Sequence, residues 1–555
     1  MEKEVIMKKK LFTLFALTLV SAGTALPAIS ADLPDEQFVT ASLSTQGLSN
    51  DRYGVFFEES VDTLRMPSLL YGFNLKNNQL DATDFCKSIE DQPCASADRL
   101  KYYALFPPCA SESSVDCIEA VYAIPNGSPA KIQGEFIRQM PALVAQPYTG
   151  NLKVGVPQGG NSGLWKIPGV KHKGGGEDYA VIVSLVGEID QKFPTSPSIG
   201  DLRVVIMPET LVRDSDYKAN VAVINDQGSP GLRHVGINHP GLKNFEACAI
   251  VEDGACALRQ GFPDDVQYGI SIRFSKNLPG WLHGRISSPQ INYQVKQYGT
   301  LIEMQGYATK VPVVGGWVEN NSVNAEQLSV IKRDYWLPNQ GSMGFPGASG
   351  DNSIKSLSAW AKIFGDKAVA YPSQWIFYNL PQYQMQNSDQ CIRSSKTLAG
   401  FVTTNSTTYA AGPPVFNQES QSLDYKVASA HYLNDGSTFK GEYNLYIDSK
   451  VARCIYKFSS APISASVSII SDNGEAKVAT TVMTERGGWL HLSASGFTFS
   501  SPTLRVKLTQ DFADKTTAKS VENAPKKATI TCVKGKTIKK VTAAKPICPS
   551  GWKKK

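Results

Sequence analysis

The stretch YAVIVSLVGEIDQKFPTSPSIGDLRVVIM, residues 179 to 207, contains two apolar runs separated by turn-forming residues. Tyr179–Ile189 and Asp201–Met207 are rich in valine and isoleucine, which favour a pleated, packed surface. Prolines, serines and a glycine fill the segment between them and favour a turn. We therefore expect two β-strands here.

The same pattern recurs along the chain, which has 45 glycines and 32 prolines and few helical patterns. Further strands are predicted at Asn220–Ile224, Gln267–Phe274 and Gln290–Val295. A hairpin is predicted at Ser464–Met483, because Asp472, Asn473 and Gly474 tolerate the positive φ values of a tight turn. Antiparallel β-sandwich domains, of jelly-roll or immunoglobulin-like type, fit this pattern best.

One helix is predicted, at Asn352–Phe364. Ile354, Leu357, Ala361 and Phe364 share a face of that helix. Asn352 or Ser353 is the expected N-cap, and Gly365 lies past the end.

A repeated motif suggests the division into domains. Leu278–Val295 and Arg486–Leu508 both contain Gly-Trp-Leu-His, then Ser-Ser-Pro, then an alternating strand. Two explanations fit this ordered recurrence equally well: two diverged copies of one sandwich domain, and coincidence. We predict sandwich domains at 32–310 and 311–512, a polar linker at 513–525 and a basic tail at 526–555.

The N-terminus has the pattern of a secretory signal peptide. Three lysines, 8 to 10, precede an apolar run from Leu11 to Val20, and small residues follow up to Ala31. The run is shorter than the ~20 residues that span a bilayer. We predict a signal peptide at 1–31, no membrane span, and an extracellular or cell-surface protein.

The ten cysteines agree with export. Three neighbouring pairs share the spacing C-x7-C, and the six histidines are not spaced to complete a metal site. Disulfides are the better interpretation, although the sequence alone does not fix their connectivity. Pairing sequence neighbours gives Cys86–Cys94, Cys109–Cys117, Cys248–Cys256, Cys391–Cys454 and Cys532–Cys548.

The C-terminal tail differs in charge from the rest of the chain. Residues 526–555 contain ten lysines and no acidic residue, a charge of +10, and the leader through Ala31 carries +2. Subtracting both from the net +6 leaves −6 for residues 32–525.

Two short strands are expected in the tail, Thr529–Val533 and Thr537–Thr542, turned by Gly535, with a third through Ile547. A module of this size needs a staple, which the Cys532–Cys548 bridge would supply. Lysines on such a scaffold should bind polyanions with strong salt dependence. The predicted binding residues are Lys534, Lys536, Lys539, Lys540, Lys545, Trp552, Lys553, Lys554 and Lys555.

The tail sequence CVKGK…KKVTA…CP.GWKKK resembles a basic two-cysteine tail of uncharacterised secreted proteins from high-GC Gram-positive bacteria. The segments PPCASESSVDCIEA and GWLH…FTFSSP are similar to companion segments of those proteins, and Trp552 stands where tyrosine is more usual. The resemblance implies secretion and residence at the cell envelope. It implies no activity and no catalytic residue.

No catalytic residue, cofactor or metal is predicted. Gly160–Gly163 (GNSG) resembles the serine segment of chymotrypsin-like proteases, but no histidine precedes Ser162, so a turn is the better interpretation. Asn434–Gly436 and Ser471–Gly474 offer oxygen ligands without completing a calcium loop.

Three classes of function follow from the sequence. The first is an envelope-associated binding or structural protein whose tail contacts an anionic polymer or glycan, with nucleic acid bound only non-specifically. The second is a secreted glycan-active hydrolase, which would need two carboxylates or a serine–histidine pair in a cleft. The third is a purely structural surface component that assembles through sheet edges. For the tail itself, the alternative to polyanion binding is that the lysines only keep it solvated and that it acts as a spacer.

Overall fold

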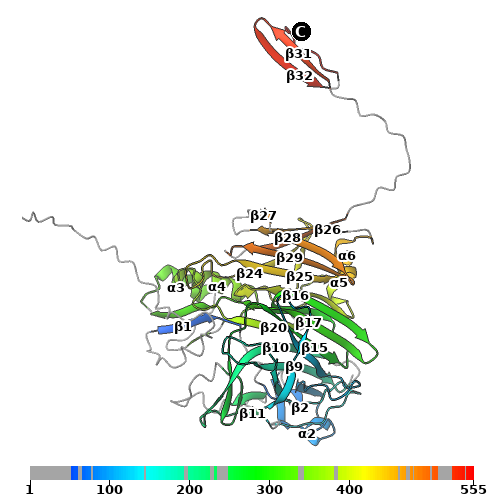
Figure 1. Ribbon diagram of the computed structural model, residues 1–555, viewed down its shortest axis with the longest axis vertical. Coiled ribbons are helices and arrows are strands. Elements are labelled where there is room, and N and C mark those ends of the chain that lie inside the picture. The colour runs from blue at the N-terminus through cyan, green and yellow to red at the C-terminus, as the bar shows by residue number, and fades with distance from the viewer. Residues whose placement is uncertain are drawn as a thin grey trace, which may run out of the picture. The chain divides into compact units, whose positions relative to one another are not determined.

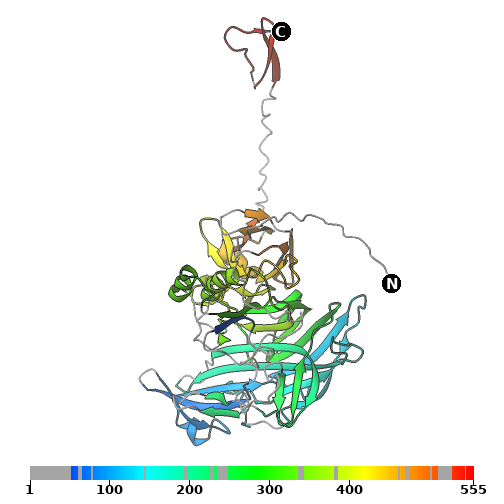
Figure 2. The same ribbon diagram turned by 90° about the vertical axis from the view of Figure 1, so that its left-hand side faces the viewer.

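The structure is a computed structural model of the whole chain, and Figures 1 and 2 show it in two views. It describes residues 52–59, 66–76, 79–142, 146–192, 198–219, 221–224, 230–233, 248–319, 321–334, 343–344, 346–380, 385–460, 463–470, 476–478, 480–499, 503–510, 528–543 and 545–555. Two compact units are present, 1–509 and 510–555. The predicted signal peptide and linker lie outside the described residues.

The two strands predicted around residues 179–207 are present. Strands β9 (Asp178–Asp190) and β10 (Ser198–Arg213) pair antiparallel, with Val183 opposite Val204 (Figure 1). Alternate residues of β10 enter different hydrophobic cores: Val204 lies in one and Val205 in the other. Because both faces of this sheet are buried, the strand reads as a continuous apolar run and not as an alternating one.

The prediction of a mainly β chain is confirmed. Most strands belong to one large set in which each pairs with at least one other. Besides β9 and β10, its members are β2 (Leu69–Lys76), β3 (Gln79–Phe85), β4 (Arg99–Leu105), β5 (Cys117–Pro125), β6 (Ile132–Gln133), β7 (Glu135–Met140), β8 (Ser162–Lys166), β13 (Cys248–Glu252), β14 (Ala255–Arg259), β15 (Val266–Phe274), β16 (Gly280–Lys296), β17 (Gly299–Lys310), β20 (Ser373–Asn379), β21 (Leu398–Thr404), β25 (Gly441–Asp448), β28 (Thr480–Arg486) and β29 (Trp489–Phe497).

Smaller sheets complete the first unit. They contain β1 (Arg52–Phe57), β18 (Val314–Glu319) and β19 (Met343–Gly344); β11 (Val221–Ile224) and β12 (Pro230–Arg233); and β22 (Thr408–Tyr409), β23 (Val415–Asn417), β24 (Ser422–Ala428), β26 (Ile463–Ile470), β27 (Ala476–Val478) and β30 (Thr503–Gln510). In the predicted hairpin, β26 pairs antiparallel with β27, and the turn between them lies outside the described residues.

The helices are α2 (Gln92–Ala95), α3 (Ala325–Asp334), α4 (Asp351–Ile363), α5 (Gln390–Arg393) and α6 (Ser449–Tyr456). Helix α4 is the predicted one, and α3 packs beside it (Figure 2). The predicted N-cap was wrong: the cap is Gly350, because the helix begins at Asp351, so Asn352 and Ser353 lie inside its first turn. The Ser353 hydroxyl lies 3.0 Å from the carbonyl oxygen of Pro346. No helix in the described part of the chain is long and apolar enough to cross a membrane.

The sheet continues across the predicted boundary at residue 310. Strand β16 pairs with β17 before that position and with β20 and β21 after it. The two Gly-Trp-Leu-His copies have different partners, because β16 runs parallel to β21, whereas β29 pairs antiparallel with β25 and β28. Trp281 is fully buried and Trp489 only partly. The duplication stays a prediction.

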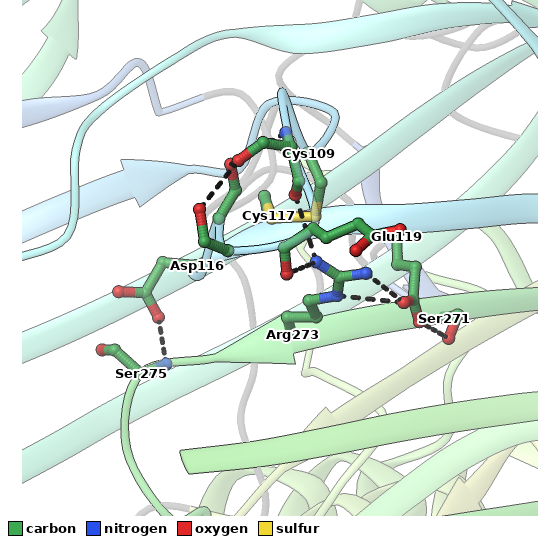
Figure 3. The surroundings of a disulfide bond; sticks show 11 residues. Cys109, Asp116, Cys117, Glu119, Ser271, Arg273 and Ser275 are labelled. Atoms are coloured by element: carbon green, nitrogen blue, oxygen red, sulfur yellow. Dashed lines mark hydrogen bonds and ion pairs between the residues drawn. A yellow bond between two sulfur atoms is a disulfide. The ribbon is translucent and has the colours of Figure 1, made fainter. Parts of the chain in front are cut away.

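All five disulfides are present as paired in the sequence analysis: Cys86–Cys94, Cys109–Cys117, Cys248–Cys256, Cys391–Cys454 and Cys532–Cys548. Figure 3 shows how one of the short loops is held. Arg273 donates through Nη1 to the carbonyl of Glu112 at 2.6 Å, inside the Cys109–Cys117 loop, and through Nε to Glu119 at 2.9 Å. The loop is therefore fixed to β15 as well as closed by sulfur.

Candidate polyanion-binding site

The tail is a small three-stranded antiparallel sheet. Strand β31 (Ala528–Lys534) is central and pairs with β32 (Thr537–Ala543) and β33 (Lys553–Lys554). Gly535, with φ of +62°, lies in the turn between β31 and β32, where an L-residue with a side chain would be strained. Cys532 is fully buried and bonded to Cys548, so the bridge ties the last segment to the central strand.

The third strand is not where the sequence analysis placed it. It is formed by Lys553–Lys554 instead of the segment through Ile547. Pro546 and Pro549 flank Ile547, and a proline has no N–H to donate to a neighbouring strand. Ile547 is 81% exposed and makes no ladder.

The predicted binding lysines are all accessible. Trp552 is half-buried, and the exposed side chains are those of Lys534, Lys536, Lys539, Lys540, Lys545, Lys553, Lys554 and Lys555. Because residues 526–555 contain no carboxylate side chain, no acidic side chain of this segment can neutralise them. The arrangement can hold an anion by charge.

The same lysines also suit a second role. On the side away from β31, β32 makes no ladder with any described strand, so its backbone groups are open to another chain. Lysines on such an edge discourage sheet-to-sheet aggregation. Lys539 and Lys540 lie on β32, and Lys553 and Lys554 form β33, which is the other edge of the sheet. Edge protection therefore accounts for these four lysines and leaves Lys534, Lys536, Lys545 and Lys555 unexplained.

The first unit contains a buried charged cluster that sequence reasoning missed. Arg285 on β16 is 1% exposed, and its Nε donates to Glu59 at 2.9 Å. Its Nη1 donates to the carbonyls of Thr404 at 2.9 Å and Ser406 at 2.6 Å, and the guanidinium lies 4.4 Å from the ring centre of Tyr409. Every part of this side chain is engaged, so the cluster joins segments and offers no open position to a ligand.

The two histidines of the repeated motif are also in structural positions. His283 is buried, stacks on Tyr409, and has the Tyr425 hydroxyl 3.2 Å from its Nδ1. Burial lowers the pKa of His283 to about 3 and that of His491 to about 4. His491 stacks on Tyr446 with ring centres 4.0 Å apart. Both imidazoles are therefore neutral near neutral pH.

One buried carboxyl lies in a row of charged residues. Lys166 is opposite Asp178 on the β8–β9 ladder, and Glu209 is opposite Arg259 on β10–β14. Tyr179 pairs with Pro208, so Asp178 and Glu209 occupy adjoining positions of β9 and β10. Glu209 is 1% exposed. Burial, reinforced by the Asp178 charge and opposed by Arg138, raises the pKa of Glu209 to about 7.

Glu209→Gln is expected to stabilise the protein at pH 8 by about 3 kcal/mol, and by less than about 1 kcal/mol at pH 5. The raised pKa means that the fold disfavours the carboxylate, so Glu209 lowers stability as the pH rises from its ordinary pKa towards 7. Urea unfolding at both pH values measures this. Glu135→Gln, at an exposed position on β7, is the control and should change stability little. An equal effect of Glu209→Gln at pH 5 and pH 8 would contradict the prediction.

The other candidates do not form a catalytic arrangement among the described residues. Ser162 begins β8 and is buried, and its neighbour Asn161 donates to the Pro141 carbonyl. His431 lies beside the Phe499 carbonyl, 2.8 Å from Nδ1, which is a structural contact. No group of three potential metal ligands lies together in the described part of the chain.

Comparison with known proteins gives no match: no family model, curated protein or solved structure is similar to this chain.

Proposed function

We propose that this is a secreted, cell-envelope-associated binding or structural protein whose lysine-rich tail contacts anionic surface polymers. The observation that supports it is the tail itself: eight exposed lysines and a half-buried tryptophan on a disulfide-pinned sheet without an acidic side chain. Five disulfides are compatible with an extracellular protein. Teichoic-type polymers and acidic glycans have the required charge.

The binding should depend strongly on salt. Exposed charges interact over a Debye length of about 8 Å at 0.15 M salt and about 3 Å at 1 M. The full chain should therefore sediment with isolated cell walls at low salt and be released at 1 M sodium chloride. Retention that is indifferent to salt, or no retention at low salt, would contradict the electrostatic proposal.

A charge-removing variant tests the same surface. Replacing Lys539, Lys540, Lys553 and Lys554 together with glutamine should weaken wall binding at low salt by about 100-fold or more, at about 1 kcal/mol for each lysine near an anionic surface. The matched control replaces the same four residues with arginine, which keeps the charge, and should bind as the wild type does. Loss of binding in both variants would point to a damaged tail fold instead.

A further inference from the structure

One face of the tail sheet is covered by the disulfide. Paired residues of an antiparallel ladder lie on the same face, and successive residues of a strand point to opposite faces. Cys532 is fully buried and bonded to Cys548. A Cβ placed on Gly551 would lie 3.5 Å from Nζ of Lys534, which is on the same face as Cys532. The segment with Cys548 and Gly551 therefore lies over this side of the sheet. We call it the covered face, and its lysines are Lys534, Lys539 and Lys554.

The opposite side of the sheet is open. Thr531 of the central strand lies between Lys540 of β32 and Lys555, whose N–H donates to the Thr531 carbonyl at 2.9 Å. Ile538, opposite Val533, is 60% exposed, and the lysines beside it are exposed too, so the described part of the tail leaves this side uncovered. We call it the open face, and its lysines are Lys540, Lys553 and Lys555.

The three lysines of the open face form a compact cationic patch. Lys540 and Lys555 stand on either side of the central strand, so their backbones are two strand spacings, about 10 Å, apart. Lys553 and Lys555 are two positions apart on one edge of the sheet, a separation of about 7 Å. Three positive charges on a patch of this size can contact successive groups of one extended polyanion.

The chemistry of the patch suits phosphate groups. All ten basic residues of 526–555 are lysines. A lysine ammonium is a compact point charge on a flexible stem, with three N–H donors that rotate freely. A carboxylate is planar and is held best by the parallel N–H groups of an arginine, whereas a phosphate offers oxygens on several sides and can be approached by two ammonium groups at once.

From this geometry we propose that the open face holds one linear phosphate polymer, and that Lys540, Lys553 and Lys555 make the charge contacts with it. The inference rests on the proposed function and specifies both the surface and the kind of partner. The lysines of the covered face lie across the sheet from the polymer, at about the 10 Å spacing of packed layers. This exceeds the Debye length of about 8 Å at 0.15 M salt, so their contribution is largely screened.

The experiment compares two variants of the full chain that have the same net charge. K540Q/K553Q/K555Q removes the lysines of the open face, and K534Q/K539Q/K554Q removes those of the covered face. Fluorescence polarisation measures the binding of labelled inorganic polyphosphate at a series of salt concentrations. Mass spectrometry selects preparations in which all five disulfides are closed, so that the tail is compared in its bridged form.

The two variants should differ in affinity and in salt dependence. The open-face variant should bind polyphosphate about 100-fold more weakly than the wild type at 0.15 M salt, and the covered-face variant only a few-fold more weakly. The slope of log affinity against log salt concentration should become shallower by about 2 in the open-face variant alone, because three fewer lysines displace counterions from the polymer. Equal losses, or equal changes of slope, would show that net charge alone matters and would overturn the inference.

Further outcomes separate the inference from the function on which it rests. If both variants lose affinity equally while the wild type still binds cell walls in a salt-dependent way, the assignment to the open face is wrong and the proposed function stands. If the wild type binds neither polyphosphate nor cell walls, the proposed function fails as well.

Two competitors test the kind of partner, each supplied at the same concentration of negative charge as the polyphosphate. Polygalacturonate is a linear polymer of carboxylates, and vesicles of phosphatidylglycerol present phosphates on a planar surface. Both should displace labelled polyphosphate less well than unlabelled polyphosphate does. Stronger displacement by either one would overturn the inference, because it would favour a carboxylate polymer or a planar partner.

Discussion

Replacing Arg285 with methionine is expected to lower the free energy of unfolding by about 3 to 5 kcal/mol, the usual cost of removing one partner of a buried ion pair. The Glu59 carboxylate, whose side chain is 9% exposed, would lose its charged partner 2.9 Å away. The carbonyls of Thr404 and Ser406 would lose their donor. Methionine fills a similar volume, so the loss reports the missing charge and hydrogen bonds more than a cavity.

The matched control is Arg505→Met. Arg505 forms a pair with Asp424 through two hydrogen bonds, at 2.8 and 2.7 Å, but its side chain is 31% exposed. A pair that remains in contact with water contributes about 1 kcal/mol or less. Urea unfolding followed by tryptophan fluorescence compares the two variants. Equal losses would contradict the importance that we assign to the burial of Arg285.

The Arg285 cluster also shows what the sequence could not predict. Glu59 is 226 positions from Arg285 in the chain, and Thr404 is 119 positions away. No local pattern joins residues that far apart, because the contact depends on which strands pair. Strands such as Tyr179–Ile189 could be predicted, since β-branched residues and flanking turns are local signals.

The same contrast holds in the tail. Its lysines and cysteine bridge could be located from charge and spacing, because residues 526–555 contain ten lysines and no acidic residue. The strand formed by Lys553 and Lys554 could not, since it depends on which segment pairs with β31. That strand was predicted through Ile547, where the flanking prolines were a signal against it.

Removing the bridge between Cys391 and Cys454 should have the second large effect. The bond joins α5 to α6 across a sequence separation of 63 residues. In the chain-entropy model a loop of that length stabilises the fold by about 4 kcal/mol, because it restricts the unfolded chain. Replacing both cysteines with serine should lower the free energy of unfolding by that amount.

The Cys86–Cys94 bridge provides the comparison. Its sequence separation is 8, so the same model gives about 2.5 kcal/mol for the corresponding double serine variant. Both variants are measured by urea unfolding, and mass spectrometry confirms that the other four bridges stay closed. A cost for the Cys391–Cys454 pair that is no larger than that for Cys86–Cys94 would contradict the entropic account. The stabilisation by the long bridge would then come from the packing of α5 against α6 in the folded protein, and not from restriction of the unfolded chain.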